Sequence, residues 1–158
     1  MNYFWPVARI RDKFVLGRYE AVNFPELSYE HVKAKVDTGA KSSAIHASNI
    51  REIKKDGKLV LRCHLLGKRN KYWYFEDYNI ITVKSSNGIK ENRYVVSLKV
   101  QVFKRAYKTA FTLSNRISMN FPVLLGRKFL RKRYVVDVSE AYLGMRARGE
   151  ISLDKRYK

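Results

Sequence analysis

The feature that most constrains this fold is a series of short runs rich in β-branched and aromatic residues. Each run shows partial two-residue alternation, which is typical of half-buried β-strands. Gly, Asn, Lys or Asp bound the runs, as expected for turns between strands. The four strongest runs occupy residues 58–66, 72–83, 93–103 and 107–113. This many strands in a small chain predict an all-β architecture, a closed barrel or a small sandwich.

Weaker patterns complete the prediction. Further strands are predicted at residues 14–22, 31–36 and 134–138, with a turn at 23–26 and a two-residue hairpin turn at Asn87-Gly88. Only residues 125–131 have helical spacing, so one short helix is expected. A length of 158 residues fits a single domain. We assign residues 14–143 to the barrel, 1–13 to an N-terminal extension and 144–158 to a basic surface tail.

The charge of the chain points to an anionic partner. The 33 Lys and Arg against 14 Asp and Glu give a net charge of +19, and nucleic acid is the commonest partner of so basic a protein. The 46% of hydrophobic residues exclude disorder as the default. No apolar run is long enough for a membrane span, so no membrane association is expected. A single cysteine, Cys63, cannot form an internal disulfide, which favours a cytoplasmic location.

One motif carries chemistry. The predicted strand 31–36 runs into Asp37-Thr38-Gly39, which presents a carboxylate on a tight turn. We expect Gly39 to let the backbone fold close beneath that carboxylate and the Thr38 hydroxyl to lock the loop. An ordinary turn would use the same residue types. However, an apolar strand ending in Gly follows at residues 121–127, some 85 positions downstream.

Together these two motifs resemble the retropepsin-like aspartic proteases. Segments 32–47, 83–88, 115–116 and 119–127 are similar to the bacterial family labelled ATP-dependent zinc protease, whose members are often associated with RimK-type ATP-grasp glutamate ligases. The resemblance covers roughly residues 14–143 and implies a retropepsin-type closed barrel. It also implies the following roles: Asp37 catalytic, Thr38, Gly39, Ala40 and Ser43 supporting it, and Leu125, Gly126 and Arg127 as the second motif.

The implied chemistry requires a symmetric dimer. An aspartic protease needs two carboxylates that share one proton, and this chain has one Asp-Thr-Gly. The second Asp37 must therefore come from another copy, which predicts a homodimeric aspartic endopeptidase acting on a peptide or protein substrate. The hairpin residues Ser85, Ser86, Asn87 and Gly88 are candidates for a flap that contacts substrate; an ordinary exposed hairpin tip is the alternative.

One departure from the retropepsin pattern bears on the substrate. The position after Asp-Thr-Gly-Ala is usually acidic and pairs with the Arg of the second motif, but here it is Lys41. Arg127 must then find another partner or a substrate carboxylate. Lys41 is a candidate anion contact, and the association with glutamate ligases suggests acidic or glutamate-rich peptides as substrates.

The sequence motifs support neither the zinc nor the ATP in the name of this family. The chain lacks His-Glu-x-x-His and Cys-x-x-Cys, and we expect His46 to be a hydrogen-bonded structural residue, so no metal is predicted. A P-loop is absent too, and no cofactor is expected. Two other functions stay open. One is a catalytically silent, retropepsin-like binding module. The other is a basic β-barrel that binds nucleic acid through residues 68–75, where cations and aromatics interleave; we favour a packing role for those aromatics.

Overall fold

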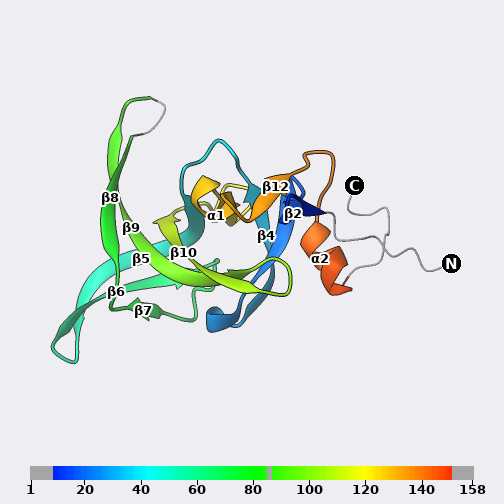
Figure 1. Cartoon of the computed structure of the whole chain (residues 1–158). Helices are drawn as coiled ribbons and strands as arrows, with labels where there is room; N and C mark the ends of the chain where they lie inside the picture. The colour runs from blue at the N-terminus through cyan, green and yellow to red at the C-terminus, as the bar shows by residue number, and fades with distance from the viewer. Residues whose placement is uncertain (1–8, 85–86, 151–158) are drawn as a thin grey trace.

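The computed structural model describes residues 9–84 and 87–150, which form an all-β fold with two short α-helices (Figure 1). Among these residues, no helix has the length and apolar character needed to cross a membrane. The strands are β1 Arg9–Ile10, β2 Lys13–Leu16, β3 Tyr19–Phe24, β4 Tyr29–Val36, β5 Ser43–Lys55, β6 Lys58–Leu65, β7 Trp73–Phe75, β8 Asn79–Lys84, β9 Lys90–Gln101, β10 Ala106–Ser114, β11 Val123–Leu125 and β12 Tyr134–Val136. The helices are the 3-10 helix η1 Pro25–Leu27, α1 Arg127–Leu130 and α2 Leu143–Arg148.

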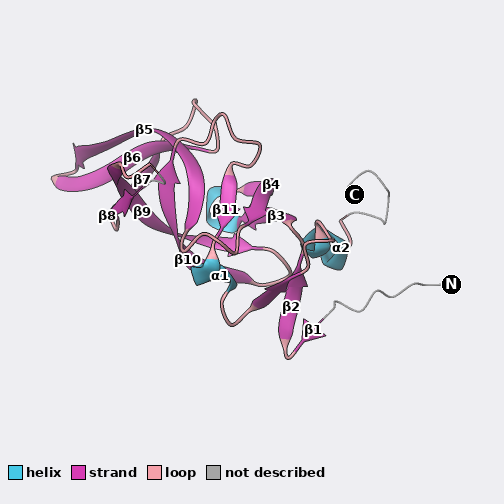
Figure 2. Cartoon of the chain, turned by 90° about the horizontal axis from the view of Figure 1, so that it is seen from above, coloured by secondary structure: helices cyan, strands magenta, loops and turns pink. Residues whose placement is uncertain are grey.

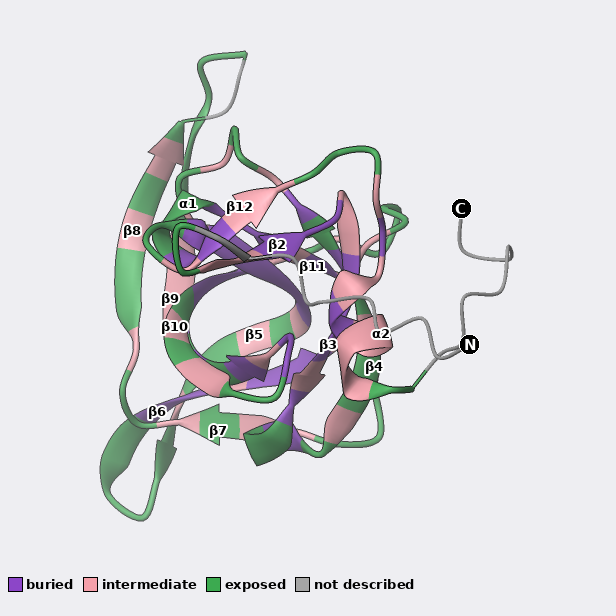
Figure 3. Ribbon diagram, turned by 45° about the vertical axis from the view of Figure 1, so that its right-hand side comes forward, coloured by how far each residue is buried: buried purple, intermediate pink, exposed green. Residues whose placement is uncertain are grey.

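The main sheet curls into a partly closed ring (Figure 3). Its strands follow the order β10-β9-β3-β4-β11-β5, and β10 then pairs in parallel with the start of β5. The ring has its least extensive strand pairing between β3 and β9, which are paired at one position, Asn23 with Gln101. Three strands, β1, β2 and β12, make a separate small sheet. This arrangement agrees with the predicted retropepsin-type barrel.

The core lies within the ring. Inward-facing residues of β3, β4, β9, β10 and β11 are buried there with the apolar side of α1. Phe24 and Phe111 meet edge to face with ring centroids 5.5 Å apart. Burial of large apolar side chains supplies most of the stability of such a domain.

Two hairpin arms extend from the ring. One is formed by β8 and β9, and the other by the outer halves of β5 and β6 with β7 alongside (Figures 1 and 2). Strands β7 and β8 each pair with a single neighbour among the described residues. Because the strands of these arms lie outside the ring, most of their residues are exposed or half-buried.

Several element predictions need correction. The long strand β5 was not predicted, because its three isoleucines are spread among residues of lower strand propensity such as Ala, Asn, Glu and Lys. The predicted strand 14–22 is split at Gly17, and the run 72–83 is divided between β7 and β8. The hairpin at Asn87-Gly88 exists, but the pairing of Lys84 with Lys90 leaves a five-residue connection where a two-residue turn was expected.

The C-terminal segment also differs from expectation. A second helix, α2, begins at Leu143 and includes the first residues of the predicted surface tail. It is held by the buried carboxylate of Glu20, which accepts hydrogen bonds from the backbone N–H groups of Leu143 (3.2 Å) and Gly144 (3.0 Å). Gly144 fits tightly, since a Cβ there would lie 2.5 Å from the Val102 carbonyl oxygen. The segment is therefore held by the Glu20 carboxylate and by the packing of Ala147 against the core, without a long apolar pattern in its sequence.

Candidate active site

Asp37 directly follows β4, at the point where the pairing of β4 with β11 ends. Val36, the last residue of β4, pairs in parallel with Leu125, the last residue of β11. The Asp37 N–H then donates to the Leu125 carbonyl oxygen at 2.9 Å. The carboxylate is therefore placed at the end of two hydrogen-bonded strands, and Asp37 itself is half-buried.

The loop after Asp37 is held by its own carboxylate. The N–H groups of Gly39 (2.9 Å) and Ala40 (3.2 Å) both donate to Asp37 Oδ1. Gly39 approaches closely, as predicted, because a Cβ there would lie 3.2 Å from this oxygen. Thr38 is exposed, and within the described ranges of a single copy its hydroxyl makes no hydrogen bond, so the expected lock by this hydroxyl stays a prediction. Asp37 Oδ2 has no hydrogen-bond partner within those ranges either, so one carboxylate oxygen is fixed and the other stays available.

Arg127 secures the same loop from α1. Its guanidinium Nη1 donates to the carbonyl oxygens of Gly39 (2.7 Å) and Thr38 (3.2 Å). The guanidinium thus takes carbonyl acceptors in place of the acidic partner that Lys41 displaces. This contact answers the question that the sequence left open about Arg127. It makes Arg127 a positioning residue for the loop that bears Asp37.

The second motif is interlocked with the first through backbone contacts. The buried Ser43 Oγ accepts a hydrogen bond from the Gly126 N–H at 3.1 Å. The Arg127 N–H donates to the Ala40 carbonyl oxygen at 2.8 Å. A Cβ on Gly126 would lie 2.5 Å from the Ser42 carbonyl oxygen, so only glycine permits this approach without a backbone shift. The predicted residues Ala40, Ser43, Leu125, Gly126 and Arg127 therefore converge on one structural unit.

A further pair, His46 and Arg116, joins β5 to the segment after β10. The Arg116 N–H donates to Nδ1 of the buried His46 at 2.9 Å, and Arg116 Nε donates to the Phe121 carbonyl oxygen at 3.1 Å. Burial lowers the pKa of His46, so the ring is neutral and can accept. His46 thus has the structural role that the sequence predicted.

Arg116 brings positive charge to the neighbourhood of Asp37. Burial lowers the pKa of Arg116, the charge of Arg93 lowers it further, and the charge of Asp37 opposes both effects. Arg116, in the segment after β10, therefore interacts both with Arg93 of β9 and with Asp37 in the loop after β4. In the sequence, Arg116 is noted only as part of segment 115–116, which is similar to the bacterial family. No rule of sequence spacing predicts that it lies near Asp37.

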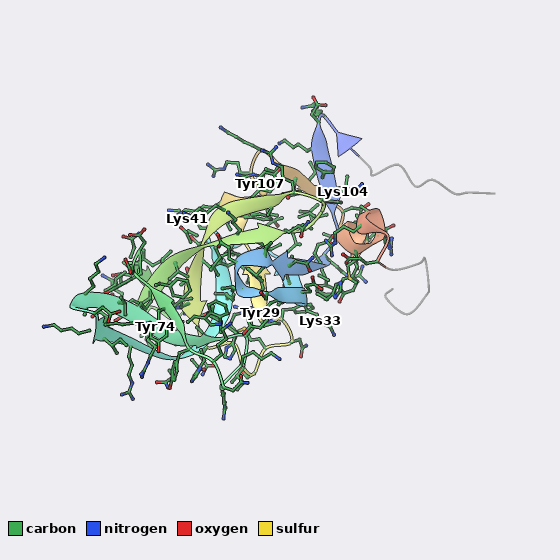
Figure 4. The ribbon with its side chains drawn as sticks, turned by 90° about the horizontal axis from the view of Figure 1, so that it is seen from below. Tyr29, Lys33, Lys41, Tyr74, Lys104 and Tyr107 are labelled. Carbon is green, nitrogen blue, oxygen red and sulfur yellow. The ribbon has the colours of Figure 1, made fainter. Side chains whose placement is uncertain are left out.

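The other predicted site residues form no contact with the Asp37 side chain among the described residues, or lie outside them. Ser85 and Ser86 fall outside the described residues. Asn87 and Gly88 are exposed in the connection between β8 and β9, and Gly88 has φ of +85°. Lys41 is exposed directly after the Asp37 loop and is labelled in Figure 4.

The described residues do not offer a zinc site. No group of three or more His, Cys, Asp or Glu able to hold a metal lies within 9–84 and 87–150. The three histidines have other partners: His31 Nε2 lies 3.0 Å from Glu150, His64 Nδ1 lies 2.8 Å from the Lys71 carbonyl oxygen, and His46 binds Arg116.

Comparison with known proteins agrees with this geometry. Residues 15–147 match the RimB-like family, described as "Retropepsin-like aspartic endopeptidase RimB". This chain belongs to the RimB-like family. A Legionella pneumophila protein of unknown function, solved as a crystal structure, is 30% identical with a TM-score of 0.65, over 81% of this chain and 95% of that one.

Longer relatives carry a different name. Two proteins named "Probable alpha-L-glutamate ligase" are similar to this RimB-like chain. The one from Shewanella pealeana is 34% identical over 92% of this chain, and the one from Shewanella halifaxensis is 36% identical over 83%. The chain spans about a third of the length of these curated relatives, 33% and 30% respectively.

Proposed function

We propose that this RimB-like chain is an aspartic endopeptidase that acts as a homodimer. The observation that carries the proposal is the state of Asp37: half-buried, with Oδ1 fixed by two backbone N–H groups and Oδ2 without a hydrogen-bond partner in the described part of the chain. A single carboxylate is half of an aspartic protease centre. The sequence has one Asp-Thr-Gly, so a two-fold-related copy supplies the other half.

Two Asp37 carboxyls that share one proton can divide the work of hydrolysis. The ionised carboxylate accepts a proton from a water molecule as the water oxygen bonds to the peptide carbonyl carbon. The protonated carboxyl, on the other subunit, donates to the carbonyl oxygen as negative charge develops there. Proton transfer to the amide nitrogen then lets the C–N bond break, giving a free acid and a free amine.

We further propose that the substrate is acidic, with glutamate-rich peptides as the first candidates. The supporting observations are Arg116, whose charge interacts with those of Arg93 and Asp37, and the exposed Lys41. Cations near the reacting centre favour anionic side chains in a bound peptide. The similar proteins named glutamate ligases suggest a functional link in which one activity adds glutamate and this one removes it.

Peptide cleavage tests this function directly. Fluorogenic peptides rich in glutamate and matched peptides with glutamine in the same positions are incubated at low salt from about pH 4 to 8. We expect the wild type to cleave the glutamate peptides faster, and Asp37→Asn to abolish cleavage. Asp56→Asn is the matched control, because Asp56 is exposed in the β5–β6 turn and its change should leave the rate unaltered.

Two results would contradict the proposal in different ways. Cleavage that survives Asp37→Asn would exclude the aspartic mechanism. Equal rates on glutamate and glutamine peptides would leave the mechanism intact and exclude the acidic preference. An inert wild type, at protein concentrations where the dimer is shown to exist, would favour the silent binding module.

A further inference from the structure

The arm formed by β5, β6 and β7 carries a basic face that the proposed hydrolysis does not use. In the antiparallel ladder, Arg51 is paired with Arg62 and Lys55 with Lys58, and Tyr74 of β7 is paired with Arg62. Paired residues point to the same side of a sheet, and so do residues two apart along a strand. We call the cations and tyrosines of this side the arm face: Arg51, Lys55, Lys58, Arg62, Tyr72 and Tyr74.

Like charges stand directly opposite each other on the arm face. Such cross-strand pairs destabilise a sheet, and this face has two of them. The acids near it lie at its hairpin end. Glu76 lies 3.7 Å from Lys58 with both side chains 71% exposed, a contact of little strength, and Asp56 lies in the turn. An anionic ligand would relieve the repulsion that the fold leaves in place.

Tyrosine rings hold two of the four cations of the arm face in position. Lys55 Nζ lies 3.9 Å from the centroid of the Tyr74 ring, and the Arg62 guanidinium lies 4.3 Å from that of Tyr72. His64 stacks on Tyr72 with ring centroids 4.0 Å apart. Arg62 Nε is buried without a hydrogen-bond partner among the described residues. Ordered cations lose less entropy when they bind an anion than free lysines do.

We propose that the arm face binds single-stranded nucleic acid, with its four cations on phosphates and Tyr74 against a base. Tyr74 stays 43% exposed although Lys55 lies over its ring, so ring surface is open for stacking. An acidic peptide would satisfy the cations but would gain nothing from the ring, which favours nucleic acid. Figure 4 shows Tyr74 on the arm, at the end of the molecule away from Lys33 and Lys104. The run 68–75, in which the sequence interleaves cations and aromatics, contributes Tyr72 and Tyr74 to the arm face. The four cations come instead from β5 and β6, and Trp73 and Phe75 pack against the core.

Binding of a fluorescently labelled uridine 12-mer, followed by anisotropy, tests the proposal. With four phosphates engaged, the slope of log K against log salt should be about −2.8 in the wild type and about −1.4 in Arg51→Gln/Lys55→Gln. Tyr74→Ala should weaken binding about fivefold or more without changing the slope. The matched control is Lys104→Gln/Lys108→Gln, which removes two exposed cations elsewhere and should change binding little.

The design separates this site from the catalytic proposal and from general charge. Asp37→Asn should bind the 12-mer like the wild type, so either proposal can fail alone. Equal losses in the two double variants would overturn the arm face as a site. A glutamate 12-mer that competes as well as the uridine 12-mer would overturn the assignment to nucleic acid in favour of an acidic peptide. Circular dichroism melting shows that each variant is folded.

Discussion

The reach of Arg127 decides how firmly the Asp37 loop is held. Its Nη1 binds two carbonyl oxygens of that loop, at 2.7 and 3.2 Å, although the residue is exposed. Arg127→Met removes both contacts without removing a buried group. We expect peptidase activity to fall about 10- to 100-fold, because a small displacement of a catalytic group carries a cost of that order.

Lys128→Met is the control for this prediction. Lys128 is the next residue of α1, is exposed, and contributes only its backbone N–H to the Asp37 loop, through the Lys41 carbonyl oxygen. Activity of this variant should match the wild type. Equal losses in both variants would show that charge on α1 matters and that the grip on the loop does not.

Gly126 shows how closely the two motifs approach each other. A Cβ at this position would lie 2.5 Å from the Ser42 carbonyl oxygen, and backbone must move to admit it. We expect Gly126→Ala to lower the free energy of unfolding by about 1–3 kcal/mol and to reduce activity with it. Chemical denaturation measures the first effect and peptide cleavage the second.

Gly57→Ala is the control for Gly126→Ala, because it strains the backbone conformation without bringing a Cβ close to other atoms. Gly57 has φ of +76°, and no atom lies within 4 Å of the position that a Cβ would take, so its substitution strains the turn alone. A loss of about 1 kcal/mol with full activity is expected there. Should Gly126→Ala keep full activity as well, the close approach of the motifs would have no role in the site.

Helix α2 is docked by a carboxylate whose ionisation is costly. Glu20 is fully buried and accepts N–H groups from Gly17, Leu143 and Gly144, yet burial outweighs these bonds and raises its pKa to about 7. The unfolded chain ionises at the ordinary value of 4.5. The stabilising contribution of Glu20 is therefore complete below pH 4.5 and is lost as the pH rises through 7.

Denaturation as a function of pH measures this loss. The difference in unfolding free energy between the wild type and Glu20→Gln should fall by about 3 kcal/mol from pH 4.5 to pH 8. Titration of His46 cancels in that difference, because both proteins contain the residue. A difference that stays constant across the range would mean that Glu20 does not ionise over it.

The same elements show what the sequence could and could not predict. β-branched runs located β6, β9 and β10, and the Asp-Thr-Gly and Gly-Arg motifs located the site unit, because local patterns specify both. Strand β5 could not be predicted from its own residues, because its extended conformation is stabilised by pairing with β10, β11 and β6. Helix α2 could not be predicted because it is held by a hydrogen bond to a carboxylate distant in sequence, that of Glu20. The role of Arg116 could not be predicted because only the tertiary fold brings this residue near Asp37.

Association of two copies must overcome their charge. Each chain carries +19, so two protomers repel each other, and salt screens that repulsion. We expect sedimentation equilibrium to give a tighter dimer at about 0.5 M salt than at about 0.05 M. A dimer that weakens with salt would indicate an interface dominated by attractive ion pairs.

Mixing of subunits tests most directly whether two Asp37 carboxyls form one catalytic centre. Wild type and Asp37→Asn are combined in equal amounts, allowed to exchange subunits, and assayed on a glutamate-rich peptide at fixed total protein. Random pairing leaves about a quarter of the dimers with two aspartates, so we predict about a quarter of the wild-type activity. Activity of about one half would contradict the shared centre, because it would mean that each subunit hydrolyses peptides with its own carboxylate.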